Sequence, residues 1–199
     1  DSLQLAVADP TPVTDHEATF RGLPPELRCY YAVGDQHGVL AGGTADHWFQ
    51  TLPPPGAVRP LRIWALGDSG TAMPAQYRVR NAYAAFTGAR PTDLWLMLGD
   101  NAYETGTDAE YQVGLFDVYP AFLRNCFLWP TLGNHEGAST TSGQPGTSTG
   151  PYYDAFVLPT AAEAGGVASG TEAYYSFNYG NTHFISLNAY QVSRSPSGP

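Results

Sequence analysis

The sequence contains no lysine: all nine of its basic residues are arginine, and nowhere do they form a run. Acidic residues number 18, so the formal net charge at pH 7 is -9. A chain of this charge repels nucleic-acid backbones and anionic lipid surfaces, and we expect neither as a partner. An acidic protein that handles a phosphate group needs metal ions to reverse the local field. The composition therefore fits a metal-dependent hydrolase without requiring one.

Long apolar runs and cysteines are also scarce. No stretch approaches the roughly 18 apolar residues that cross a bilayer, so no membrane span is predicted. The two cysteines, Cys29 and Cys126, are too few for a disulfide scaffold, and we favour two separate buried thiols over a disulfide. Because the chain starts at Asp1 and not at Met, the lack of a leader says nothing about its compartment.

The 199 residues are 43% hydrophobic and 13% aromatic, which is ample material for packed cores. Residues 1–57 are short alternating runs broken by Pro, Gly and Asp, a pattern that predicts a small antiparallel sandwich. Its first predicted strands are LQLAVA at 3–8 and EATFRGL at 17–23. The segment TLPPPGAVRPLR at 51–62 is rich in proline, which cannot continue a sheet. We place a domain boundary there, giving domains of residues 1–57 and 58–199.

Beyond the boundary, strands alternate with helices, which predicts a parallel sheet. The strands are LRIWAL, DLWLML and FLWPTL. A helix runs from Pro74 to Gly88, and a second one opens with a capping box at Thr107 and Glu110. The apolar faces expected to be buried are Ala75, Val79, Ala82 and Phe86 in the first helix, and Tyr111, Leu115, Val118 and Phe122 in the second.

Two more strands, EAYYSFNYG and NTHFISLNAY, are predicted to join at a Gly-Asn turn. The polar, low-complexity segment 137–151 is interpreted as a mobile surface loop. His183 lies inside the apolar run THFISL, which favours a buried structural histidine over a metal ligand.

Three strands of the second region end in similar polar motifs, GDSG at 67–70, GDNAY at 99–103 and GNHE at 133–136. The carboxyl ends of parallel strands meet at one edge of the sheet, where open α/β sheets place their sites. We therefore expect convergence of Asp68, Asp100, Tyr103, Asn134 and His135. This mixture of oxygen and nitrogen donors without thiolate suits iron, manganese or zinc.

These motifs resemble those of the metallophosphoesterases, specifically the purple acid phosphatase branch, whose ordered motifs are GDxG, GDxxY, GNHE, VxxH and GHxH. GDSG, GDNAY and GNHE match the first three. The branch commonly carries an N-terminal fibronectin type III-like sandwich ahead of a proline-rich hinge. The resemblance implies a partial sandwich of this kind, followed by a truncated α/β domain of four layers, α/β/β/α.

The resemblance also implies roles for the residues of the motifs. Asp68 and Tyr103 would bind a first metal, Fe(III), whose tyrosinate bond gives colour. Asp100 would bridge both metals, and Asn134 would bind the second, which is Fe, Zn or Mn. A metal-activated water attacks phosphorus in such a site, with Asn134 and His135 near the substrate and His135 assisting as the catalytic residue. Where relatives place another histidine ligand, this chain has Gly70, and Tyr103 supplies the missing bond.

The chain departs from the family pattern at its end, because it stops after FISLNAYQVSRSPSGP and neither VxxH nor GHxH is present. Three expected histidine ligands are therefore missing, so we expect a fragment that is clipped at both ends and inactive by itself. An earlier GDQH at 34–37 superficially resembles another metallophosphoesterase motif, but no helix follows it. We interpret that segment as a hairpin turn and give His37 no metal role.

The expected activity is hydrolysis of phosphate monoesters on small organic substrates, as in an acid phosphatase. A phosphodiesterase or nucleotide-hydrolysing activity is the alternative within enzymes, because the motifs determine the metals and not the leaving group. The alternative of another class is a secreted binding module with an inactive phosphatase domain. The resemblance favours an extracellular or periplasmic protein. Glu136 is expected to orient His135 or cap a turn, with no direct chemistry.

Overall fold

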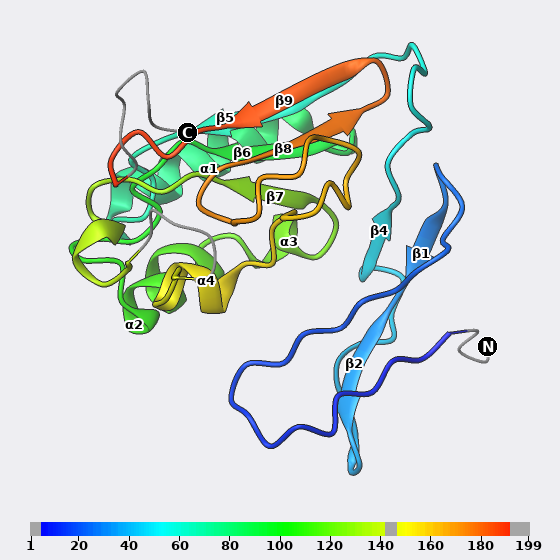
Figure 1. Cartoon of the computed structure of the whole chain (residues 1–199), viewed down its shortest axis with the longest axis horizontal. Coiled ribbons are helices and arrows are strands. Elements are labelled where there is room, and N and C mark those ends of the chain that lie inside the picture. The colour runs from blue at the N-terminus through cyan, green and yellow to red at the C-terminus, as the bar shows by residue number, and fades with distance from the viewer. Residues whose placement is uncertain (1–4, 142–146, 192–199) are drawn as a thin grey trace.

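The computed structural model describes residues 5–141 and 147–191 (Figure 1). Its N-terminal part has two separate antiparallel ladders. Strand β1 (Arg28–Tyr30) pairs with β4 (Trp48–Gln50), and β2 (Ala32–Asp35) pairs with β3 (Gly38–Gly42). The Asp35 carboxylate accepts hydrogen bonds from the backbone N–H groups of His37 and Gly38 and so closes the β2–β3 turn. The prediction of a hairpin at GDQH is therefore confirmed.

The N-terminal ladders do not enclose a core. None of residues 5–52 is buried, and residues 5–27 form no strand, so the strand expected at 17–23 was wrong. The strand expected at 3–8 lies partly outside the described residues. Apolar side chains such as Val39 and Leu40 are exposed, and among residues 5–52 the strands form only two separate two-stranded ladders. A closed sandwich is thus not formed by the described residues, and the fibronectin-like assignment stays a prediction.

A parallel sheet organises the second part. Strands β5 (Ile63–Leu66), β6 (Leu94–Met97) and β7 (Phe127–Pro130) pair in that order, with Trp64 opposite Trp95 and Trp95 opposite Leu128. This confirms the three predicted strands and their parallel pairing. Consecutive strands are adjacent, so their carboxyl ends lie side by side at one edge of the sheet.

Helix α1 (Pro74–Thr87) begins and ends where predicted, with Gly88 as its C-cap, but it buries the opposite face. Val79 and Phe86 are exposed, whereas Gln76 and Thr87 are buried. The expected apolar face was therefore wrong. The reason is tertiary: the Tyr83 ring stacks on Trp64 at 4.0 Å between centroids, and this contact orients the helix.

The second helical segment is broken into three pieces: α2 (Asp108–Tyr111), the π-helical turn η1 (Gln112–Phe116) and α3 (Pro120–Leu123). The capping box of Thr107 and Glu110 is confirmed. Tyr111, Leu115 and Val118 are buried, as expected. The prediction of one continuous helix was wrong, because Pro120 disfavours helical geometry at the residue before it.

The chain continues through η2 (Glu136–Ala138) and α4 (Pro151–Ala155) into the antiparallel hairpin of β8 (Tyr175–Tyr179) and β9 (Thr182–Ser186). Figure 1 shows this hairpin crossing in front of the parallel sheet. Phe177 stacks on Trp129 of β7 at 3.7 Å between centroids and on Phe184 at 4.8 Å. The predicted hairpin is confirmed, and it covers the sheet face opposite the helices.

Helices, parallel sheet and hairpin make three layers. The expected fourth layer, helices over the second sheet, is not formed within 5–141 and 147–191, where the outer hairpin residues Thr182, His183 and Ile185 are exposed. The prediction of a buried His183 was therefore wrong. Side chains alternate along a strand, so when Phe184 faces the core its neighbours face solvent. The His183 imidazole Nδ1 lies 2.7 Å from Asn178 Oδ1.

Cys29 and Cys126 are free, as favoured, and both are partly buried. Residues 142–146 of the predicted mobile loop lie outside the described residues. Within the described ranges, no helix has the length and apolar character needed to cross a membrane.

Candidate metal centre

The two aspartates of the motifs occupy equivalent places at the ends of neighbouring strands. Asp68 follows β5 and Asp100 follows β6, and each has a left-handed backbone with φ of 53°. Such a conformation is costly for a residue with a side chain, although aspartate tolerates it better than most. The Asp68 N–H donates to the Gly99 carbonyl at 3.1 Å, which joins the two turns directly.

Tyr103 connects the two carboxylates. Its phenolic oxygen lies 2.9 Å from Asp68 Oδ1 and 3.2 Å from Asp100 Oδ2. A phenol has one proton, so it can donate fully to only one of the two oxygens. Three oxygen atoms with one proton among them form a strongly negative cluster that a cation would stabilise.

The pKa of Tyr103 is raised far above its usual value. Burial contributes most, and the hydrogen bond to Asp68 and the charges of Asp100 and Asp68 add to it. The phenol therefore stays protonated between the carboxylates unless a cation compensates their charge.

His135 lies beside this cluster without joining the carboxylates through its ring. Its backbone N–H donates to Asp100 Oδ1 at 3.0 Å, and its ring centroid is 4.2 Å from that of Tyr103. The ring Nδ1 is 2.6 Å from the Glu104 carbonyl oxygen, which can only accept, so Nδ1 carries a proton. This hydrogen bond is the main cause of the raised pKa of His135. The tautomer is therefore determined by the protein.

Asn134 lies in the same loop but is exposed. Among the described residues, no hydrogen bond joins its amide to Asp68, Asp100 or Tyr103. The structure thus brings Asp68, Asp100, Tyr103 and His135 together and places Asn134 at the rim of the group.

Close backbone packing explains the glycine in the first motif. A Cβ atom at Gly70 would overlap the Asn101 carbonyl group and the Ala102 nitrogen. The Tyr103 N–H donates to the Gly70 carbonyl oxygen at 3.0 Å. A side chain at position 70 is therefore incompatible with the observed path of the loop that carries Tyr103.

Glu136 was expected to orient His135 or cap a turn, but its contacts reach further, to the loop that follows β6. Its side chain is fully buried and accepts hydrogen bonds from the backbone N–H groups of Asp100, Asn101, Ala102 and Gly133. Burial raises its pKa, and the N–H groups oppose that shift. No sequence pattern shows these contacts, because three of the four donors lie more than 30 residues away and belong to the backbone.

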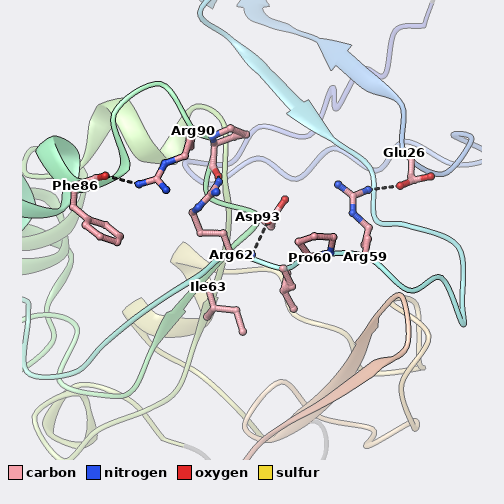
Figure 2. Close-up of a pocket in the computed structure, with 10 residues that line it drawn as sticks. Glu26, Arg59, Pro60, Arg62, Ile63, Phe86, Arg90 and Asp93 are labelled. Carbon is pink, nitrogen blue, oxygen red and sulfur yellow. Dashed lines mark hydrogen bonds and ion pairs between the residues drawn. The ribbon is translucent and has the colours of Figure 1, made fainter.

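His37 and a large surface cavity both lie away from the motif residues. His37 is exposed in the β2–β3 turn. A cavity of about 870 Å³ lies at the amino end of β5, between Glu26, Arg59, Arg62, Arg90 and Asp93 (Figure 2). The three guanidinium groups already donate to protein acceptors, namely the Glu26 carboxylate and the carbonyls of Pro91, Phe86 and Thr87. This cavity is at the opposite end of the sheet from the motifs.

The donors at the motif edge fit a hard cation. Two carboxylates and a phenol share one small volume, and an amide oxygen lies in the adjoining loop. Across the described ranges, no three His, Cys, Asp or Glu side chains come together as a metal site. In addition to the two carboxylates, an ion held here would therefore need the oxygens of Tyr103 and Asn134 as ligands.

Comparisons with known proteins agree with the motifs. No family model matches the chain. Purple acid phosphatases 23 and 15 of Arabidopsis thaliana are 29% and 28% identical to it over 88% of its length. The chain spans only 40% and 35% of these curated relatives.

The fold is similar to that of a purple acid phosphatase from yellow lupin (Lupinus luteus) seeds. The TM-score is 0.52 over 76% of this chain and 28% of the lupin chain, with 17% sequence identity. The relatives and the solved structure together confirm the resemblance of this chain to the purple acid phosphatase branch.

Proposed function

We propose that the intact protein hydrolyses phosphate monoesters at a binuclear metal centre held by Asp68, Asp100, Tyr103 and Asn134. The observation that carries this proposal is the Tyr103 hydroxyl within 2.9 and 3.2 Å of carboxylates from two adjacent strand ends. The similarity to phosphatases supports a phosphoester substrate. Because the chain is acidic, binding of an anionic phosphate is favoured by a cation between the phosphate and the protein.

Each residue has a distinct part in this proposal. Asp68 and Tyr103 would hold the first metal, Asp100 would serve both, and Asn134 would hold the second. Tyr103 would bind as a phenolate, for which the charge of the cation would have to outweigh the burial and the carboxylates that raise the pKa of Tyr103. A bound pair of cations supplies an acidified water and neutralises charge during in-line displacement at phosphorus.

His135 is the proposed catalytic residue. Because its Nδ1 proton is engaged by the Glu104 carbonyl, Nε2 is the nitrogen left for the substrate. The protonated ring donates from Nε2 to the leaving-group oxygen, and the raised pKa favours that protonated form.

The finer assignments are also part of the proposal. Fe(III) would take the first position, since tyrosinate would be the donor there, and Fe, Zn or Mn would take the second. Residues 1–57 correspond to part of a fibronectin-like domain, and residues 58–199 to the N-terminal part of the phosphatase domain. A secreted location, extracellular or periplasmic, rests on the family alone.

Activity and colour test the proposal together. The intact protein is loaded with iron and zinc and assayed with nitrophenyl phosphate and bis-nitrophenyl phosphate in parallel. We expect turnover of the monoester that Asp100→Asn abolishes, and a visible absorption band that Tyr103→Phe removes. Faster turnover of the diester would favour the phosphodiesterase alternative. A loaded protein without turnover of either substrate would favour the binding-module alternative.

A further inference from the structure

We propose that Glu136 is a positioning residue that joins the two loops of the metal centre through its carboxylate. The inference rests on the proposed function, because the residues that it positions are the proposed ligands. Glu136 itself does not face the donor cluster. Its side chain is fully buried beneath the loops that follow β6 and β7.

The carboxylate binds both loops at once. Oε1 accepts from the N–H groups of Asn101 at 2.5 Å and Ala102 at 2.9 Å. Oε2 accepts from the N–H groups of Asp100 at 3.1 Å and Gly133 at 2.7 Å. One oxygen thus bridges the loop of Asp100 and the loop of Asn134 and His135.

A return contact closes the connection. The His135 N–H donates to Asp100 Oδ1, so the two loops are joined in both directions. Glycine packing leaves little room for another arrangement: a Cβ at Gly133 would overlap Asp100, and a Cβ at Gly106 would overlap the Glu136 backbone. The left-handed backbone of Asp100 is held in place by this set of contacts.

Only a carboxylate satisfies this arrangement. A glutamine has the same shape, but one of its two terminal groups is an NH₂ that donates and cannot accept. Whichever way the amide is turned, two buried N–H groups lose their acceptor and face a donor. Buried donors without acceptors are costly, so we expect the loops to separate locally.

The first measurement uses amide hydrogen exchange of the unaltered chain. The N–H groups of Asn101, Ala102 and Gly133 lie in loops and donate to Glu136, so we expect them to be protected. Exchange as fast as in the exposed segment 11–20 would contradict the inference without any variant.

The second measurement compares Glu136→Gln with Glu172→Gln. Glu172 is a half-buried carboxylate that accepts from the Leu158 N–H at 2.6 Å, and it belongs to neither loop. In Glu136→Gln we expect faster exchange in segments 98–103 and 131–135. In the intact protein we expect iron affinity to fall by about 10- to 100-fold, as when other partners of metal ligands are removed. Glu172→Gln should retain both properties.

Glu136→Asp covers the case in which the glutamine variant does not fold. The aspartate keeps two acceptor oxygens, so Glu136→Asp should retain more metal affinity than Glu136→Gln or Glu136→Ala, which lack a carboxylate. Equal losses in Glu136→Asp and Glu136→Ala would contradict the role of the carboxylate. Unchanged iron affinity in Glu136→Gln would contradict the inference alone, whereas an unaltered protein that binds no metal would contradict the proposed function.

Discussion

Single residues at the strand ends are placed by close backbone contacts. The letters of the three motifs allowed Asp68, Asp100, Tyr103 and His135 to be predicted as neighbours, because parallel strands end at one edge. The contacts that hold them could not be predicted. Glu136 acts through backbone N–H groups, which every residue has, so the sequence carries no sign of its partners.

Gly70 packs against the backbone of the loop that carries Tyr103. Gly70→Ala places a Cβ atom against the Asn101–Ala102 peptide, so the loop of Tyr103 must move. We expect a loss of about 1–3 kcal/mol in the free energy of unfolding, typical of overpacking, together with loss of the visible band of the iron-loaded intact protein. Chemical denaturation and absorption spectroscopy measure the two effects.

Gly67→Ala is the matched control in the same loop. Its Cβ would meet the Leu98 Cβ at 3.4 Å, which is ordinary contact, so the free energy of unfolding should change by no more than about 1 kcal/mol. Equal effects of the two substitutions would contradict the packing explanation.

Whole elements were predicted well where local pattern and tertiary packing agree. The three parallel strands and the capping box follow from such agreement. Helix α1 shows the limit, because the Tyr83–Trp64 stack decides which face is buried. Pro120 indicates the break between η1 and α3 in the sequence itself. The continuous helix was nevertheless predicted because the apolar residues recur at helical spacing across it.

The capping box predicts a pH dependence. Burial alone would raise the pKa of Glu110, but hydrogen bonds from the backbone and side chain of Thr107, and from the backbones of Thr105 and Glu104, lower it to about 2. A lowered pKa in the folded state adds stability above the ordinary value of 4.5, and this stability is lost as pH falls toward 2. Urea unfolding of the unaltered chain and Glu110→Gln should therefore differ at pH 7 and converge in acid. A difference that is independent of pH would contradict this.

The hairpin gives a prediction about layers. Phe177 is 1% exposed between Trp129 and Phe184, whereas Ile185 on the other face is 65% exposed. Phe177→Ala should reduce the free energy of unfolding by about 3–5 kcal/mol. Ile185→Ala should change it by about 0.5 kcal/mol or less. A large effect of Ile185→Ala would show that a further layer covers this face in solution.

Within the described residues, the molecule combines a cored α/β part with N-terminal ladders in which none of residues 5–52 is buried. The α/β architecture could be predicted because strands and helices alternate along the chain. A closed sandwich could not be predicted in the same way. Alternation of apolar and polar residues predicts a strand with one apolar face, but it does not show which sheet covers that face.

The 199-residue chain by itself should bind metal weakly. Asp68 and Asp100 repel each other, and His135, the histidine beside them, already donates from Nδ1 to Glu104. We expect no phosphatase activity above that of Asp100→Asn after incubation of this chain with iron and zinc. Strong metal-dependent turnover by this chain would show that the ligands are misassigned, with His37 and His183 as the first candidates to examine.

Anomalous X-ray diffraction from crystals of the intact protein, loaded with iron and zinc, tests the metal centre most directly. We expect an iron peak in contact with Asp68 and Tyr103, a second metal peak in contact with Asn134, and Asp100 between the two. Metal peaks elsewhere in the molecule, with the Tyr103 hydroxyl still within hydrogen-bond distance of both carboxylates, would contradict the proposed metal centre.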